Sequence, residues 1–289
     1  MEYPIRQLVP EDFPPLLKEI PERDYPTHLC IRGGLPEPGT TYLCVVGSRA
    51  TSVYGRRVTQ QLIAGLAKYP IAIVSGMALG IDAEAHRAAL DVGLPTVAML
   101  PSSLDDASIY PATNKALAQR ILARGGCLLS EYDKPHKAML HDFAKRNRIA
   151  AGMSTAALIV EAGEKSGTLI TARLALDYNR EVLAVPHELG RETGAGVNRL
   201  IREGATLVRT SDDILQALGL KPLDNPVQAT LPTDLTAPEA ALLEVLIEAT
   251  EKDTLIDAAG LSAQDANIAL SSLLLRGLIV ERLGKIERA

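Results

Sequence analysis

The sequence predicts an α/β fold with a doubly wound, mostly parallel sheet, followed by a small C-terminal winged-helix domain. Seven short apolar runs alternate with longer stretches of helical pattern. The runs are continuously apolar, as expected for strands that helices cover on both faces. A proline-rich stretch then precedes a tail in which three helical patterns are followed by a hairpin pattern, the order typical of a winged helix.

The α/β domain is expected to occupy residues 41–219. Residues 1–40 are rich in proline and contain Gly33-Gly34, so we expect an irregular lead-in there. The apolar runs that predict the strands are, in order, Tyr42–Val46, Ile71–Val74, Thr96–Leu100, Cys127–Leu129, Ala156–Val160, Glu181–Val185 and Thr206–Val208.

Residues 220–234 are expected to be a linker, because three prolines in fifteen residues favour extended chain. In residues 235–289, Thr236 is expected to cap a helix that runs to about Thr250. A short helix follows Asp253, and a third helix is capped by Ser262 and stopped by Gly277. This tail holds nine acidic and five basic residues, so we expect a protein-contact or regulatory role, with duplex DNA binding as the alternative.

The composition argues against general attraction of polyanions, because 30 Lys and Arg face 35 Asp and Glu, a net charge of −5. Any nucleic-acid site must be a local patch. Three widely spaced cysteines predict neither disulfides nor a metal site, and no apolar run is long enough for a membrane span. We therefore expect a soluble, cytoplasmic protein.

The turn Gly47-Ser48-Arg49 follows the first strand of the α/β domain and precedes a helix near Val53. Glycine allows close approach of the backbone to a ligand, a helix N-terminus offers free N–H groups, and Arg49 can bind a phosphate with two hydrogen bonds. The triplet is equally compatible with a tight turn that carries a surface arginine.

The second turn, Ser75–Gly80, includes Gly76 and leads into a helix that holds Asp82 and His86. It lacks the glycine spacing of a dinucleotide fingerprint, and no Walker motif occurs, so neither NAD nor ATP is expected as a cofactor. Asp82 and His86 lie four residues apart, which allows a mutual hydrogen bond. The alternative for His86 is a buried structural histidine.

The strongest local signal lies between Lys134 and Arg148, where cations surround the aromatic Phe143. An aromatic ring among cations is the combination that binds single-stranded nucleic acid, by base stacking and charge neutralisation. The alternative is a solvated basic loop with Phe143 as its apolar anchor. The candidate binding residues here are Lys137, Phe143, Lys145, Arg146 and Arg148.

A third anion site is expected after the strand Ala156–Val160, where Lys165, Ser166, Gly167 and Thr168 open a helix. Glu161 would repel a phosphate, so it is interpreted as a buried brace. The sequence has no nucleophile elbow and no His-Glu-x-x-His metal motif, which argues against hydrolase or metalloenzyme chemistry.

Taken in this order, the motifs resemble the DprA/Smf family of bacterial DNA-processing proteins. The similarity runs from about Tyr25 to Leu218 and includes, among others, Val46-Gly-Ser-Arg49, Ser75-Gly-Met-Ala-Leu-Gly80, Tyr110-Pro111, Arg146-Asn-Arg148, Ser166-Gly-Thr168 and Ala184-Val-Pro186. The resemblance implies an extended Rossmann-like domain that binds and protects single-stranded DNA without catalysis. It also implies a homodimer formed through that domain, and loading of RecA recombinase onto the strand during natural transformation and recombination.

By position in the family's motifs, Arg49 is the pocket arginine, Phe143 the stacking aromatic and Lys165 a phosphate contact, while either Arg146 or Arg148 is structural. Ala144 and His187 stand where the family usually has proline and glycine, and no N-terminal SAM-like domain is expected. A different class, the nucleotide phosphoribohydrolases, would need Glu161 and Arg173 around a glycosidic bond. Its Pro-Gly-Gly-x-Gly-Thr signature is absent.

Overall fold

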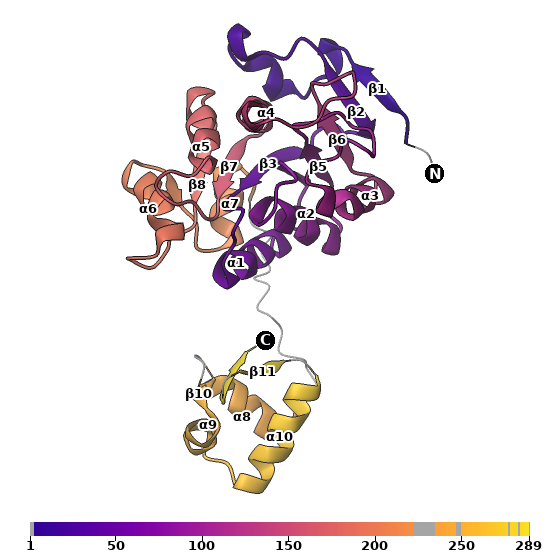
Figure 1. Ribbon diagram of the computed structural model, residues 1–289. Coiled ribbons are helices and arrows are strands. Elements are labelled where there is room, and N and C mark those ends of the chain that lie inside the picture. The colour runs from indigo at the N-terminus through magenta and orange to yellow at the C-terminus, as the bar shows by residue number, and fades with distance from the viewer. Residues whose placement is uncertain (1–2, 222–234, 247–249, 277, 283, 289) are drawn as a thin grey trace. The chain divides into compact units, whose positions relative to one another are not determined.

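The computed structural model describes residues 3–221, 235–246, 250–276, 278–282 and 284–288 of the chain. The chain divides into two compact units, Met1–Asp224 and Asn225–Ala289 (Figure 1). Most of the linker expected at 220–234 lies outside the described residues. Each unit is described by itself.

The first unit is built on a nine-stranded sheet with the order β1-β2-β6-β5-β4-β3-β7-β8-β9. All pairs from β6 to β9 are parallel, which confirms the predicted α/β fold with a mostly parallel sheet. The seven predicted strands are present, and each differs from its predicted run by one residue at one end. They are β3 Thr41–Val46, β4 Ile71–Ser75, β5 Thr96–Met99, β6 Cys127–Ser130, β7 Ala156–Ile159, β8 Glu181–Ala184 and β9 Thr206–Leu207.

The expectation of an irregular lead-in at residues 1–40 is wrong. Strands β1 (Ile5–Leu8) and β2 (Leu29–Gly33) extend the sheet in antiparallel fashion beyond β6. The prolines between them lie mainly in and around short 3-10 helices, where the missing N–H costs little. The prolines therefore do not prevent two short strands, of which β1 pairs with β2 and β2 pairs in addition with β6, far along the chain.

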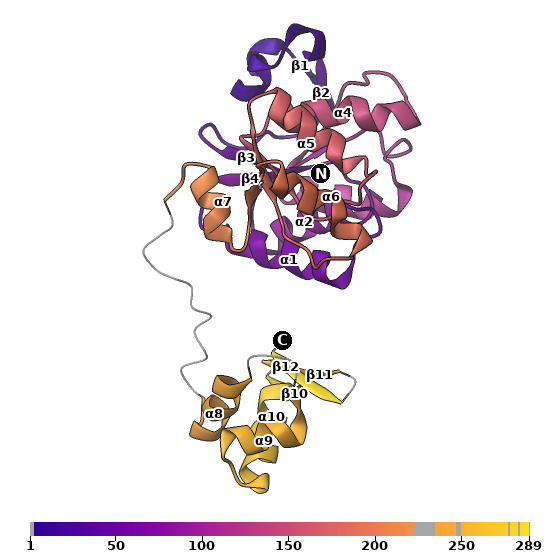
Figure 2. The same ribbon diagram turned by 90° about the vertical axis from the view of Figure 1, so that its left-hand side faces the viewer.

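Helices cover both faces of this sheet (Figures 1 and 2). Tyr42, Cys44 and Val46 of β3 pack into the core beneath α4, α5 and α6, whereas Leu43 and Val45 pack into the core beneath α1, α2 and α7. Both sets are buried, as the continuous apolar runs predict. The helices are α1 Val53–Ala64, α2 Ile81–Asp91, α3 Lys115–Ala123, α4 Leu140–Gly152, α5 Thr168–Asp177, α6 Ala195–Arg202 and α7 Ser211–Ala217.

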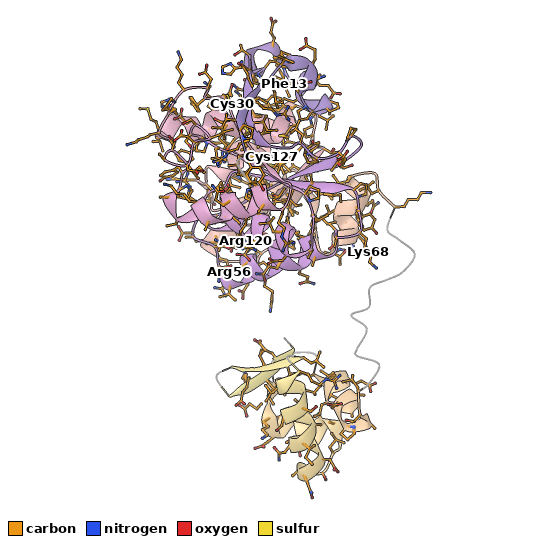
Figure 3. All side chains as sticks on the ribbon, turned by 90° about the vertical axis from the view of Figure 1, so that its right-hand side faces the viewer. Phe13, Cys30, Arg56, Lys68, Arg120 and Cys127 are labelled. Carbon is orange, nitrogen blue, oxygen red and sulfur yellow. The ribbon has the colours of Figure 1, made fainter. Side chains whose placement is uncertain are left out.

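The three cysteines pack in the core of the first unit, as small apolar residues do. Cys30, Cys44 and Cys127 are free and buried, and Figure 3 shows Cys30 and Cys127 among the packed side chains. Burial raises the pKa of Cys44 and of Cys127 to about 12, so neither thiol is reactive at neutral pH.

The described part of the second unit contains the helices α8 (Ala237–Val245), α9 (Lys252–Ala259) and α10 (Ala263–Leu275). Its sheet has the order β10-β12-β11, with β10 at Thr250–Glu251, β11 at Ile279–Arg282 and β12 at Lys285–Arg288. The three predicted helices and the hairpin are present, whereas strand β10 was not predicted. The first helix ends earlier than Thr250, because Thr250 and Glu251 pair with β12. The predicted stop at Gly277 lies outside the described residues, and the winged-helix assignment stays a prediction.

Two features are absent from the residues that the structure describes. None of their helices combines the length and apolar character that a membrane crossing requires. None of their His, Cys, Asp and Glu side chains gather into a cluster that could hold a metal ion.

Candidate functional site

A cavity of about 490 Å³ lies where the predicted turns converge. In the sheet, Val46 at the end of β3 pairs with Ile159 at the end of β7, so the turns after these strands begin side by side. This edge of a parallel sheet is the common place for ligands. The lining residues are Val46, Gly47, Ser48, Arg49, Ala78, Asp82, Leu140, Phe143, Ala144, Arg146, Asn147, Ser166, Gly167, Thr168, Ile170 and Thr171.

The turn after β3 approaches α2 so closely that only glycine fits at position 47. A Cβ atom on Gly47 would lie 2.6 Å from the Cγ1 atom of buried Ile81. The hydroxyl of Ser48 accepts a 3.2 Å hydrogen bond from the backbone N–H of Ala50 and holds the turn. Arg49 is left exposed at the cavity.

Arg49 and Phe143 form a stacked pair on the cavity wall. The guanidinium carbon of Arg49 lies 4.6 Å from the centroid of the Phe143 ring, a cation–π contact. The ring of Tyr110 meets Phe143 from another side, with centroids 5.7 Å apart and planes at 72°. A cation and two aromatic rings are therefore contiguous here.

Phe143 is positioned by the start of α4, which Asp142 holds. The buried carboxylate of Asp142 accepts hydrogen bonds from the backbone N–H of Met139 at 2.8 Å and from the Tyr132 hydroxyl, and it contacts Nε2 of His136 at 2.7 Å. Burial alone would raise the pKa of Asp142, but the hydrogen bonds from Tyr132 and His136 keep that pKa below its ordinary value. The carboxylate thus fixes the turn next to Phe143.

Arg146 lines the same cavity but is almost completely buried, at 7% exposed. Its guanidinium donates to the carbonyl of Met99 at 2.6 Å, to the carbonyl of Gly76, and at 3.4 Å to the carboxylate of Asp82. Burial raises the pKa of Asp82, and the charge of Arg146 opposes that rise. Arg146 is committed to linking three segments of the fold.

The N-terminal end of α5 contributes the third side of the cavity. Ser166, Gly167 and Thr168 line it, and the Ser166 hydroxyl accepts a 3.2 Å hydrogen bond from the N–H of Thr168. The positive end of the helix dipole and the hydroxyls suit an anion. Lys165 is exposed beside this turn and does not line the cavity.

Glu161 is a brace, as the sequence interpretation holds. It is fully buried, and its carboxylate accepts hydrogen bonds from the Thr51 hydroxyl at 2.9 Å, from the N–H of Ser52 at 3.0 Å and from the Ser52 hydroxyl. A Cβ atom on Gly55 would lie 2.4 Å from this carboxylate, so glycine is needed for the contact. Glu161 thereby fixes the start of α1 and does not line the cavity.

The structure brings eight predicted site residues together at the cavity and leaves five outside its lining. Gly76 leaves space for the Arg146 side chain, because a Cβ atom at position 76 would lie 1.8 Å from the Arg146 guanidinium. Arg148 forms an ion pair with Glu131 and donates to the carbonyl of Asp24 at 2.6 Å, a structural arrangement. The other three, Lys137, Lys145 and Lys165, are exposed.

The structure also shows the partners of Asp82 and His86, for which the sequence allowed a mutual hydrogen bond. Asp82 and His86 make no mutual hydrogen bond, because Asp82 faces Arg146 while Nδ1 of His86 contacts the Thr96 hydroxyl at 2.6 Å. His86 is thus a buried structural histidine, the alternative named above.

The two departures from the family pattern lie at different places. Ala144 lines the cavity, whereas Nε2 of His187 lies 2.7 Å from the carbonyl of Val160. His187 therefore bridges the ends of β7 and β8.

Several residues of the site were missed by the sequence interpretation. Asn147, Leu140 and Ile170 line the cavity, and Tyr110 contacts Phe143. The helical spacing of 140, 143, 144 and 147 places these residues on one face of α4 and is a signal that the sequence contains. Tyr110 lies 33 positions before Phe143, and no local pattern connects the two.

Comparison with known proteins agrees with this architecture. The family model described as DNA recombination-mediator protein A matches residues 6–219. Protein Smf of Escherichia coli is 37% identical over an alignment that covers 96% of this chain and 76% of that protein. A putative DNA processing protein DprA of Mycobacterium tuberculosis is 44% identical, over 64% of this chain and 47% of its own length.

Two solved structures share the fold. The DprA structure from Streptococcus pneumoniae superposes with a TM-score of 0.68 at 35% identity and covers 74% of each chain. The structure of DprA from Helicobacter pylori, described for its single-stranded DNA binding mode, gives a TM-score of 0.65 at 30% identity, over 75% of this chain and 98% of that one. On sequence and structure together, the chain belongs to the DNA recombination-mediator protein A family.

Proposed function

We propose that this chain binds single-stranded DNA in the cavity, protects it, and loads RecA recombinase onto it during natural transformation and recombination, without catalysing a reaction. The observation that carries the proposal is the Arg49–Phe143 pair, which opens into the same cavity as the N-terminal end of α5. One cavity thus offers a ring for a base and donors for a phosphate.

The chemistry of the cavity suits a flexible strand. A base stacks on an aromatic ring whatever its identity, and such stacking contributes roughly 1 to 3 kcal/mol per base. Arg49, Ser166 and the N-terminal end of α5 surround the position that the adjoining phosphate would take. In a duplex both faces of each base are covered by its neighbours, so only a single strand can present a base to Phe143.

The exposed lysines extend this positive region beyond the cavity. Lys165 adjoins the α5 turn, and Lys137 and Lys145 lie around the start of α4. They can neutralise flanking phosphates although the whole chain carries a net charge of −5. The related H. pylori protein, described for its single-stranded DNA binding mode, supports the same choice of ligand.

The homodimer through the first unit, the RecA contact and the role in transformation are proposed on family membership. The absence of catalysis is supported by the placement of Glu161. A phosphoribohydrolase would need that carboxylate at the glycosidic bond, whereas here it lies outside the cavity lining and accepts hydrogen bonds from Thr51 and Ser52.

Equilibrium binding to an oligo-dT strand and to its duplex with oligo-dA, over a salt series and without nucleotide, tests the proposal. We expect a preference for the single strand, with log affinity falling against log salt by about 0.7 for each phosphate contacted. Equal affinity for both forms, or no binding at low salt, would contradict it. RecA loading is tested separately, by the rate of RecA filament formation on strands covered by single-strand-binding protein.

A further inference from the structure

We propose that Tyr110 is a second base-stacking position, so that two neighbouring nucleotides of one strand lie on two rings, one on Phe143 and one on Tyr110. This inference rests on the proposed function of the cavity. It extends the binding site from the cavity onto the loop that follows β5.

The geometry places Tyr110 at the right distance. Its ring centroid lies 5.7 Å from that of Phe143, a span that one nucleotide of an extended strand can bridge. Stacked bases rise about 3.4 Å per step, and an unstacked strand reaches further. Tyr110 is 45% exposed, so its ring is accessible to a base.

The backbone on both sides of Tyr110 is fixed, although the ring is exposed. The preceding residue, Ile109, is 3% exposed and packs into the core, and its N–H donates to the carbonyl of Asp105 at 3.2 Å. On the other side, buried Asn114 donates to the carbonyl of Met77 at 2.8 Å. An aromatic ring on such a backbone loses little conformational entropy when a base stacks on it.

The angle between the rings adds a structural consequence. Their planes meet at 72°, so bases that stack on both rings cannot be parallel to each other. The strand must turn between these two nucleotides, and their mutual stacking must be broken. A duplex cannot do this without losing base pairs, so the second ring sharpens the preference for single-stranded DNA.

The chain contains no tryptophan, so single tryptophan reporters can test the inference directly. Three full-length variants, Tyr110→Trp, Phe143→Trp and Tyr54→Trp, are titrated with oligo-dT. Tyr54 is the matched control, because it is 38% exposed, does not line the cavity, and has its ring against His187, whereas the Tyr110 ring contacts Phe143. We expect the fluorescence of the first two variants to be quenched on binding and that of Tyr54→Trp to stay unchanged.

Affinity gives an independent readout. We expect Tyr110→Ala to bind oligo-dT about fivefold to tenfold more weakly, near the lower limit for base stacking, and Tyr110→Phe to bind like the unaltered protein. Circular dichroism of each variant checks that the fold is retained.

The outcomes separate the two levels of the proposal. Quenching in Phe143→Trp alone, with unchanged affinity of Tyr110→Ala, would overturn the role of Tyr110 and leave the cavity function standing. Quenching in neither Phe143→Trp nor Tyr110→Trp, with affinity unaffected by Phe143→Ala, would overturn the proposed function as well.

Discussion

Two groups of residues meet at the cavity and differ in what holds them. The outer group, Arg49 and Phe143, is accessible at the cavity wall and makes its principal contact within the pair. The inner group, Asp82 and Arg146, is buried. Arg146 donates hydrogen bonds to backbone carbonyls at the ends of β4 and β5 and to the carboxylate of Asp82. Arginine occurs in both groups, so burial and not residue type distinguishes the arginine that is available to a ligand from the one that is engaged within the fold.

This difference predicts which measurement each substitution affects. Changes in the inner group remove a partner from a buried charge, so they lower the free energy of unfolding of the first unit. Under the proposed function, changes in the outer group are expected to leave the fold unaltered and to lower the affinity for single-stranded DNA. Four experiments test the separation, from the largest expected effect to the smallest.

Arg146→Ala is expected to lower the free energy of unfolding by about 3 to 5 kcal/mol, because it leaves the Asp82 carboxylate buried without its cation. Urea denaturation of the full chain measures this loss. Arg49→Ala is the control and is expected to change stability by less than about 0.5 kcal/mol. Replacing both buried partners, as in Arg146→Met with Asp82→Leu, should restore part of the loss. Equal, small losses for Arg146→Ala and Arg49→Ala would break the comparison.

The buried residue His86 is expected to make the stability of the first unit depend on pH. Burial, aided by the charge of Arg146, lowers the pKa of His86 to about 3, against an ordinary value near 6.5. Between these two pH values the unfolded chain binds a proton at His86 that the folded chain does not. The free energy of unfolding is therefore not reduced by His86 above pH 6.5, and it falls as the pH decreases below 6.5. The fall contributed by His86 is up to about 1.4 kcal/mol per pH unit.

The measurement for His86 is the urea midpoint at several pH values between 6.5 and 4.5. His86→Asn keeps a donor near Thr96 and cannot be protonated, so its midpoint should depend less on pH than that of the unaltered protein. An identical pH dependence for His86→Asn and the unaltered protein would refute the assignment.

Phe143→Ala is expected to weaken binding of oligo-dT by roughly 1 to 3 kcal/mol, because a base loses its stacking surface. The slope of log affinity against log salt should hardly change, since stacking releases few counterions. Fluorescence anisotropy with a labelled strand at several salt concentrations gives both quantities. A large change in the slope with little loss of affinity would show that Phe143 does not act by stacking.

Arg49→Ala gives the most subtle predicted signal, a salt slope that is shallower by about 0.7 if one phosphate contact is lost. Lys165→Ala should have a similar effect. Lys68→Ala is the control, because Lys68 is exposed and lies just before the start of β4 (Figure 3), at the edge of the sheet opposite the cavity. Equal slopes for all three variants would place the phosphate elsewhere.

The strands and the convergence of the turns could be predicted from the sequence. Continuous apolar runs mark strands buried on both faces, and the carboxyl ends of parallel strands share one edge, so Gly47 and Ser166 were expected at one site. Strand β2 was missed because one of its pairing partners, β6, lies far along the chain, and β1 was missed because it is an edge strand that pairs with β2 alone. Cys30 of β2, for example, pairs with Ser130 of β6.

The sequence by itself determined the α/β class, the family and the residue types that surround the cavity, because hydrophobic periodicity and turn motifs are local properties of the chain. Only the tertiary structure decided which cations are available to a ligand. Two of the partners of Arg146 are the carbonyls of Gly76 and Met99, 70 and 47 positions away. Backbone carbonyls have no signature in the sequence, so the folded arrangement alone shows that Arg146 is engaged within the fold and Arg49 is exposed.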